Sequence, residues 1–351
     1  MFGPPPLRRT LAAALRDLGD GRPRVRAAAV RDLAHHAEAS HGDVVAALER
    51  CLSDASAEVR GDAALALADV RGVEALASLL VALEDDAPHV RQMAITALGE
   101  LGDPRARERL RRALGDPRPE VRFQAVIAFG RVAPDEAEAA LLAALGDDDP
   151  HIRHIALRVA EERADEAGLP IAPALLARAR ELLADPSPLV HAGAAILLAR
   201  AGDPLGTALV ADVVAGRVHT PEREDEASAI ELAGELGLTD MRPFLERRAY
   251  GLARFRNETF AWQARVALAR MGHARARRDI LRGLAAWSRD RRTLAAAAAG
   301  RARLLEALPL LEAMRGRDAW ADPGAIDEAL VLLAAHRDRT AERRAEASAL
   351  P

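Results

Sequence analysis

A short block of apolar and polar positions returns six times in the first two thirds of the chain. Each block centres on a Val or Ile anchor, and apolar residues follow it at positions +4, +5 and +8. That spacing places them on one side of a helix and predicts a buried stripe. The anchors lie 31 to 38 residues apart, at Val25, Val59, Val90, Val121, Ile152 and Val190.

Three further positions of the block are nearly invariant. An alanine stands four residues after every anchor. An aspartate stands five residues before it, at Asp20, Asp54, Asp85, Asp116, Asp147 and Asp185. An arginine follows it at Arg26, Arg60, Arg91, Arg122 and Arg153, and His191 takes that place in the sixth copy. We expect a structural ladder between repeats, since guanidinium binds carboxylate with two parallel hydrogen bonds. The alternative, a binding stripe, does not need six near-identical copies.

Each block predicts two helices joined by a tight turn. A proline two residues before most anchors, such as Pro88, suits the first position of a helix. Glycines such as Gly102 follow the first helix, where a left-handed residue ends it. A second apolar stripe comes next, as at Leu141 and Leu145. The invariant alanine indicates that neighbouring helices cross closely, because a larger side chain would separate them.

The runs Asp85-Asp86-Ala87-Pro88-His89-Val90-Arg91 and Leu98-Gly99-Glu100-Leu101-Gly102-Asp103-Pro104 carry a family resemblance. They resemble the HEAT-repeat family, in particular the short HEAT-like repeats of phycobilin lyase subunits. The resemblance covers about residues 20–205. It implies an α-solenoid in which the second helices line a concave surface. Because the family includes scaffolds, lyases, a hydroxylase and DNA-binding enzymes, it implies no single function.

Beyond Val190 the copies degrade but keep their period, with units near Asp225, Phe260, Arg291 and Ala325. We therefore predict an all-α fold, a single solenoid over residues 1–351 with about ten helix-turn-helix repeats. The expected parts are an N-terminal cap (1–19), well-formed repeats (20–216), degenerate repeats with a basic face (217–336) and a C-terminal tail (337–351).

Composition excludes several classes of chemistry. All basic residues besides histidine are arginine, so lysine nucleophiles, Schiff bases and Walker loops are excluded. Cys51 is the only cysteine, which rules out a disulfide framework and multi-cysteine zinc sites. No HExxH, CxxC, GxSxG or GxGxxG motif occurs. We expect no catalytic residues, no metal and no cofactor. Without a long apolar run or a signal peptide, we expect a cytoplasmic protein that does not enter membranes.

Charge is distributed unevenly along the chain. Residues 1–241 contain 27 arginines and 40 acidic residues, whereas residues 242–317 contain 18 arginines and 6 acidic residues. Residues 318–351 contain 4 arginines and 7 acidic residues. The basic segment also holds six of the ten aromatic residues. This asymmetry indicates a strongly dipolar molecule with a candidate surface for anions.

Helical spacing selects the candidate binding residues of the basic segment. Two expected second helices, near 241–255 and 274–289, each carry arginines on the side opposite their apolar stripe. On the second helix, Trp287 falls with Ile280 and Leu284, which predicts that it is packed. The candidates are Arg247, Tyr250, Arg254, Arg275, Arg278, Arg282 and Arg289. The alternative interpretation is solvated helix faces in an arginine-only protein.

The function that these patterns favour is a non-enzymatic scaffold whose arginine-rich C-terminal half binds an acidic segment of a protein partner. One alternative is a nucleic-acid-binding protein similar to the alkylpurine DNA glycosylases. It is disfavoured because no aspartate framed by aromatic residues is evident and because most of the chain is acidic. A second alternative is a chromophore lyase, for which only the repeats match. Head-to-tail self-association through the two oppositely charged halves is a further expectation.

Overall fold

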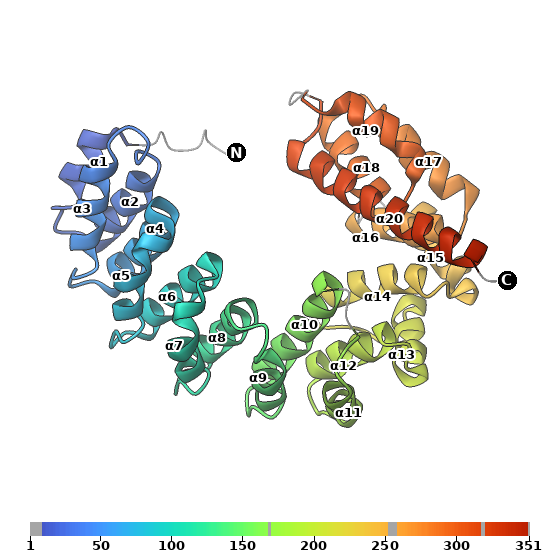
Figure 1. The fold of residues 1–351 in the computed structure, drawn as a ribbon, viewed down its shortest axis with the longest axis horizontal. Coiled ribbons are helices and arrows are strands. Elements are labelled where there is room, and N and C mark those ends of the chain that lie inside the picture. The colour runs from blue at the N-terminus through green and yellow to red at the C-terminus, as the bar shows by residue number, and fades with distance from the viewer. Residues whose placement is uncertain (1–8, 168–169, 252–257, 317–319, 350–351) are drawn as a thin grey trace. The chain divides into compact units, whose positions relative to one another are not determined.

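The computed structural model is all-helical, which confirms the predicted fold class. It describes residues 9–167, 170–251, 258–316 and 320–349, and these contain twenty α-helices and no strand (Figure 1). The chain divides into two compact units, residues 1–182 and 183–351, called the first and the second unit below. Within the described residues no single helix is long and apolar enough to cross a membrane. The helices α12 (Pro188–Arg200) and α13 (Pro204–Ala215) have the required length and apolarity only when taken together, and this pair is bent by 119°.

The first unit is a row of helical hairpins behind a short first helix, α1 (Leu11–Asp17). The first helix of each hairpin contacts the first helix of the next, from α2 through α4, α6 and α8 to α10 (Figure 1). Four of these helices begin at the predicted proline. The hairpins are α2 (Pro23–Ala34) with α3 (His41–Cys51), α4 (Ala57–Arg71) with α5 (Leu76–Ala82), α6 (Pro88–Leu101) with α7 (Arg107–Ala113), α8 (Pro119–Val132) with α9 (Ala137–Ala144), and α10 (Pro150–Ala167) with α11 (Pro173–Leu182).

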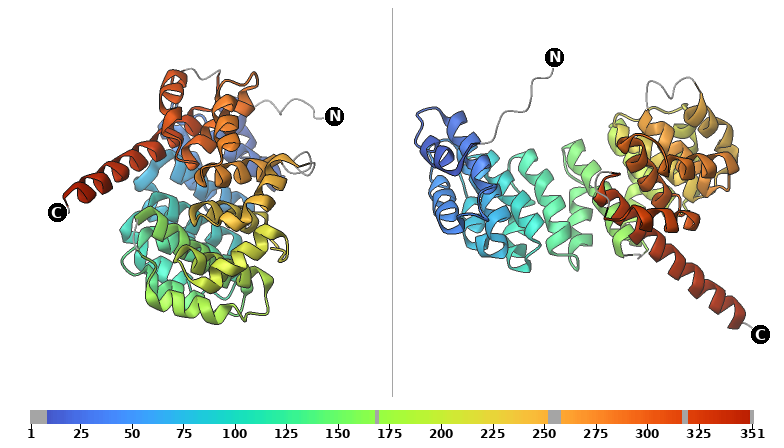
Figure 2. Two further views of the ribbon diagram at one scale, coloured as in Figure 1. Left: turned by 90° about the vertical axis from the view of Figure 1, so that its right-hand side faces the viewer. Right: turned by 90° about the horizontal axis from the view of Figure 1, so that it is seen from above.

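The second unit repeats this arrangement and ends in one long helix, α20 (Pro323–Ala349). Its first helices again form a continuous row, from α12 through α14, α16 and α18 to α20. The predicted tail, residues 337–351, falls mainly on the second part of α20, which extends beyond the other helices of its unit (Figure 2). The hairpins are α12 (Pro188–Arg200) with α13 (Pro204–Ala215), α14 (Arg223–Glu235) with α15 (Arg242–Tyr250), α16 (Glu258–Arg270) with α17 (Ala274–Leu284), and α18 (Arg289–Arg301) with α19 (Leu308–Met314).

Small residues let the first helices of each unit approach one another. The alanine at position +4 is fully buried in every well-formed copy, as at Ala94 and Ala125. At position +9, Gly99 of α6 lies directly against α8, and a Cβ added there would lie 2.9 Å from the Cβ of Ala128. In the second unit a Cβ on Gly234 would lie only 2.4 Å from the Cα of Ala267. Backbone separation is thus set by small side chains at both positions.

An arginine–aspartate ladder joins successive hairpins of the first unit. Arg60 Nε and Nη2 each donate to one carboxylate oxygen of Asp85 in the next repeat, both at 2.8 Å. Its Nη1 donates at 2.9 Å to the backbone carbonyl of Asp54 in its own repeat. The same bidentate geometry, at 2.7–2.9 Å, joins Arg26 to Asp54, Arg91 to Asp116 and Arg122 to Asp147.

Each ladder aspartate also fixes its own turn. Asp85 Oδ1 accepts the backbone N–H of Ala87 at 2.8 Å, two residues further on. The hydrogen bonds from Arg60 hold the pKa of Asp85 below its ordinary value of 3.8, against the opposing effect of desolvation. One carboxylate therefore both shapes a turn and binds the preceding repeat.

The later copies keep the contacts of the ladder to the backbone. Arg153 donates to the carbonyl of Asp147 at 2.7 Å, and Asp185 accepts the N–H of Ser187 at 2.9 Å. His191 replaces the arginine, and its Nδ1 lies 2.8 Å from the carbonyl oxygen of Leu183. In the second unit Arg292 donates at 2.6 Å to the carbonyl of Ala286, six residues before it. The ladder arginines donate to a carbonyl at the same distance along the chain. Here the accepting residue is an alanine, so the bond forms without an aspartate side chain.

We expect Gly99→Ala to lower the free energy of unfolding by about 1–3 kcal/mol, because the new methyl group overpacks against Ala128. Alanine by itself favours a helix over glycine by roughly 0.5–1 kcal/mol. Gly42→Ala is the matched control, since nothing lies within 4 Å of an added Cβ on α3. Urea denaturation followed by circular dichroism measures both. Equal stability of the two variants would contradict close helix crossing at Gly99.

We expect Arg60→Ala to lower the free energy of unfolding at pH 7 by about 2–3 kcal/mol, because it removes charge-assisted bonds to a mostly buried carboxylate. Because the pKa of Asp85 is lowered in the folded state, this stabilisation is present above pH 3.8 and is lost as pH falls below it. The difference in the free energy of unfolding between wild type and variant therefore becomes smaller toward pH 2. Arg112→Ala, at an exposed arginine, serves as the control. A loss of stability in Arg60→Ala that does not depend on pH would contradict an ionic bond between Arg60 and Asp85.

Candidate functional site

A cavity of about 330 Å³ in the second unit is lined mainly by polar and charged side chains. It lies among the end of α15, the middle of α16, most of α17 and the start of α18. Its walls contain four arginines and one carboxylate. The lining residues are Tyr250, Trp262, Arg265, Arg275, Asp279, Arg282, Gly283, Ala286 and Arg291.

Arg265 enters the cavity from α16, at a position that other repeats fill with an apolar residue. It stands five residues after the Phe260 anchor, in register with Ile95 and Leu157. Its guanidinium carbon lies 4.8 Å from the ring centre of Trp262 and 5.8 Å from that of Tyr250. Nη2 donates to the carbonyl of Ala249 at 3.3 Å. Aromatic faces and a carbonyl thus hold a charged group where the repeat normally buries a hydrocarbon side chain.

Arg275 covers the other aromatic wall. Its guanidinium carbon lies 3.9 Å from the ring centre of Tyr250, and its Nε lies 3.8 Å from Oδ2 of Asp279, one helical turn along α17. Stacking occupies the flat face of a guanidinium and leaves the N–H groups at its edge free to donate. Arg275 is therefore positioned by Tyr250 while most of its side chain stays exposed to solvent.

Two neutral donors complete the walls. Burial, together with the negative charge of Asp279, raises the pKa of Tyr250 to about 12, so its hydroxyl stays protonated. Among the described residues, neither Tyr250 Oη nor Trp262 Nε1 has a hydrogen-bond partner, and both atoms are buried. An indole N–H can only donate. The cavity therefore offers hydrogen-bond donors in excess of acceptors.

Arg282 and Arg291 lie at the rim, on α17 and α18. Both are exposed, and within the described part of the chain no carboxylate lies within ion-pair distance of either. Arginines elsewhere in the unit do have such partners: Arg248 pairs with Glu226 and Arg270 with Glu235. The arrangement can bind an anion.

Three of the seven candidate residues line this cavity: Tyr250, Arg275 and Arg282. Arg247 is exposed and stacks on Phe244, with 5.8 Å between the guanidinium carbon and the ring centre. Arg278 is exposed on α17 outside the lining, and Arg254 lies outside the described residues.

The predicted helix over 274–289 is wrong at its end, because α17 stops at Leu284. Arg289 therefore begins α18 instead of sharing a face with Arg275. Trp287 was expected to pack beside Leu284, but it lies in the turn between the helices and is fully exposed. Helical phase says nothing about side chains beyond the last turn.

Sequence analysis missed Trp262, Arg265, Asp279 and Arg291 as members of one site. A signal existed for Arg265, which breaks the apolar stripe at position +5 of its repeat. The absence of an aspartate framed by aromatic residues was also a wrong inference, because Asp279 lines the cavity together with Tyr250 and Trp262. These residues come from three helices, so spacing along the chain does not reveal their proximity.

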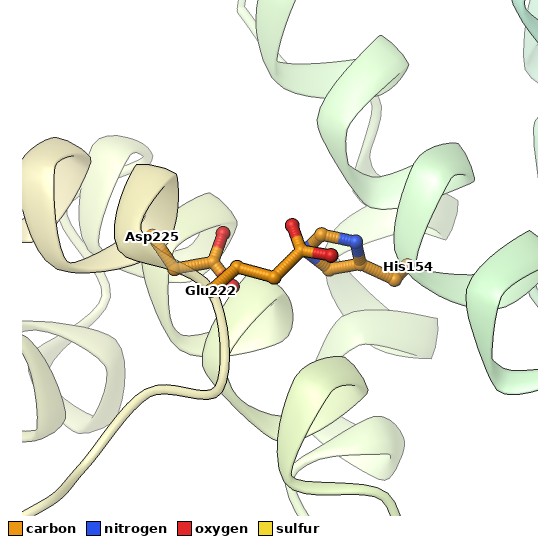
Figure 3. A group of neighbouring side chains, drawn as sticks. All are labelled: His154, Glu222 and Asp225. Atoms are coloured by element: carbon orange, nitrogen blue, oxygen red, sulfur yellow. The ribbon is translucent and has the colours of Figure 1, made fainter. Parts of the chain in front are cut away.

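Asp225 is a second break in the repeat pattern. It occupies the anchor position, which is Val or Ile in the well-formed copies, and it is fully buried. Figure 3 shows its carboxylate in the first turn of α14, with Glu222 just before the helix. The acidic residues of the first turn, Glu224 to Glu226, lie at the positive end of the helix dipole, where negative charge is stabilising. This substitution explains why the copy reads as degenerate.

Comparisons with known proteins agree with the helical architecture. A family model for HEAT repeats matches residues 8–88, 51–117, 78–161 and 110–181. Curated protein sequences give no match. Among solved structures, YibA from Escherichia coli is 19% identical with a TM-score of 0.53, over 74% of this chain and 92% of that chain.

Two further solved structures are similar at lower scores. The CpcE–CpcF complex of phycocyanin lyase from Nostoc is 18% identical with a TM-score of 0.39, over 77% of this chain and 90% of that one. Human deoxyhypusine hydroxylase is 19% identical with a TM-score of 0.33, over 75% and 96%. The likeness to YibA concerns the fold alone. The family model spans the five hairpins of the first unit, so residues 8–181 are HEAT repeats.

Proposed function

We propose that this HEAT-repeat protein is a non-enzymatic scaffold whose second unit binds an acidic segment of another protein. The observation that carries the proposal is the cavity in which four arginines face one aspartate. Arg278 and Arg289 are exposed on the same two helices, α17 and α18. Carboxylates of a partner would meet bidentate donors on Arg282 and Arg291, which no carboxylate of the described residues approaches within ion-pair distance.

Local concentration of charge supports this more than net charge does. The second unit contains 25 arginines against 23 acidic residues, so it is close to neutral as a whole. Ion pairs such as Arg277 with Glu306 and Arg301 with Glu231 neutralise arginines on neighbouring surfaces. These pairs leave the cavity and the exposed arginines of α17 and α18 as a local concentration of positive charge, which favours contact with a short acidic segment.

We expect Arg278→Glu with Arg282→Glu to weaken binding of a glutamate-rich peptide by about tenfold or more, because two attractions become repulsions. Isothermal titration with the full chain measures the dissociation constant. Arg24→Glu with Arg118→Glu is the control: both arginines are exposed in the first unit and the charge change is the same. Unchanged binding by the first pair, or equal weakening by both pairs, would contradict the proposal.

A second candidate function, nucleic-acid binding, is favoured by Asp279 lying beside two aromatic residues within the arginine cavity. Aromatic side chains stack on bases and arginines contact phosphates. Against it, Arg275 covers the ring of Tyr250 and Arg265 that of Trp262, which leaves less of each ring for a base.

We expect duplex DNA to bind less tightly than the acidic peptide at about 0.15 M salt, because one arginine cluster contacts few phosphates. Fluorescence anisotropy over a salt series measures the affinity. A DNA affinity that exceeds that of the peptide, and that Arg282→Glu removes while the first-unit control retains it, would select the second function. A chromophore-lyase function, head-to-tail association and a cytoplasmic location stay predictions.

A further inference from the structure

We propose that the cavity binds a phosphate monoester carried by a side chain of the acidic segment, so that phosphorylation of the partner controls its capture. This inference rests on the proposed function and adds the chemical group that the cavity selects. The site is the space enclosed by Tyr250, Trp262, Arg265, Arg275 and Arg282, with Arg291 at the rim.

The balance of charge in the walls fits a dianion. Four guanidinium groups face a single carboxylate, that of Asp279. A lone partner carboxylate brings one negative charge and leaves most of the positive charge uncompensated. A phosphate monoester carries about −1.5 to −2 charges at pH 7 and three strong acceptor oxygens. It therefore matches the cavity better in both charge and number of acceptors.

The donors are held in place before any ligand arrives. The faces of Arg265 and Arg275 rest on the rings of Trp262 and Tyr250, at 4.8 and 3.9 Å from the ring centres. Ordering a free arginine side chain on binding is costly, and stacking reduces that cost. Arg275 is largely exposed, so the N–H groups at the edge of its guanidinium can donate to a tetrahedral oxyanion, which accepts hydrogen bonds from several directions.

The two buried donors point to an acceptor ligand as well. Trp262 is 6% exposed, and its Nε1–H has no hydrogen-bond partner among the described residues. The same holds for the Tyr250 hydroxyl, which remains protonated because its pKa is raised. Buried donors normally have partners, and both of these side chains line the cavity. Phosphate oxygens would supply the acceptors that the protein lacks here.

Arg265 is a charged residue at a position where the repeat is otherwise apolar, which indicates a functional role. Other repeats carry Ala, Val, Ile or Leu at position +5, where the side chain packs between hairpins. A charged residue in that stripe is a local break in the repeat pattern, and such breaks concentrate at functional sites. Replacing Arg265 with leucine restores the stripe and removes a donor, so stability and binding are expected to change in opposite directions.

A protein-borne phosphate fits better than a nucleic-acid backbone. Nucleic acid presents a phosphate at each nucleotide and calls for a track of cations. Here two of the arginines beyond the cavity, Arg270 and Arg277, are paired with Glu235 and Glu306, which interrupts such a track. One isolated anion pocket beside exposed Trp287 suits a single modified side chain with an apolar neighbour.

The test uses the full chain and two glutamate-rich peptides that differ only in one serine, which is either phosphorylated or not. We expect the phosphopeptide to bind about tenfold more tightly, since charge-assisted bonds to phosphate are roughly twice as strong as neutral ones. Its affinity rises from pH 5 to pH 7, because the second phosphate pKa is about 6. The unphosphorylated peptide shows no such rise.

Variants separate the cavity from the surrounding surface. Arg265→Leu is expected to remove the preference for phosphate while the urea midpoint stays the same or rises. Arg278→Leu is the control, because Arg278 is exposed on α17 outside the cavity lining and its loss changes the charge as much as Arg265→Leu does. This variant is expected to keep the preference for the phosphopeptide. A large fall in the midpoint for Arg265→Leu would show a structural arginine and overturn its assignment to the site.

The outcomes distinguish this inference from the proposed function. If wild type binds both peptides with equal affinity, the phosphate site is overturned. The scaffold proposal still stands in that case if Arg278→Glu with Arg282→Glu weakens binding of the acidic peptide. Failure of both peptides to bind overturns both proposals. Tighter binding of a single-stranded oligonucleotide than of the phosphopeptide, lost in Arg265→Leu, assigns the pocket to nucleic acid and overturns the protein-borne source.

Discussion

The close contact between first helices is the constraint on which the rest of this structure depends. Alanine at position +4 is buried in every copy, and glycine at position +9 removes the last atom that would separate α6 from α8. Since the apolar stripes of a hairpin are covered only when neighbouring hairpins pack against them, a hairpin is stable only within the row. Alanine and leucine supply most of this packing, and aromatic residues make up only 3% of the chain.

Polar contacts then fix the orientation that hydrophobic packing leaves open. Burial is non-directional, whereas the bidentate bond of Arg60 to Asp85 has a defined geometry and a defined partner. The cavity in the second unit uses the same residue type differently. Two of its arginines, Arg265 and Arg275, stack on aromatic rings, and all four line the cavity.

The sequence was sufficient to predict the repeat and not the site, for a physical reason. A periodic stripe, the prolines at helix starts and the invariant alanine are local signals repeated many times, and together they predict helical hairpins correctly. The cavity joins Tyr250, Trp262, Arg265 and Asp279 from three helices, and their proximity depends on where each helix ends. The helix predicted to run five residues past Leu284 placed Arg289 and Trp287 wrongly. Only Arg265 carried a local signal, a charge in an apolar position.

The double role of the ladder aspartates makes whole repeats interchangeable. Asp85 and Asp116 each shape a turn and receive the arginine of the repeat before, and they lie 31 residues apart. Excision of residues 85–115 would bring Asp116 to the place of Asp85, where Arg60 finds an identical carboxylate. The first link, Asp20, has no ladder arginine before it and is bound by Arg22 of its own turn. Such a chain can lengthen or shorten by duplication or loss of one period without creating a mismatched junction.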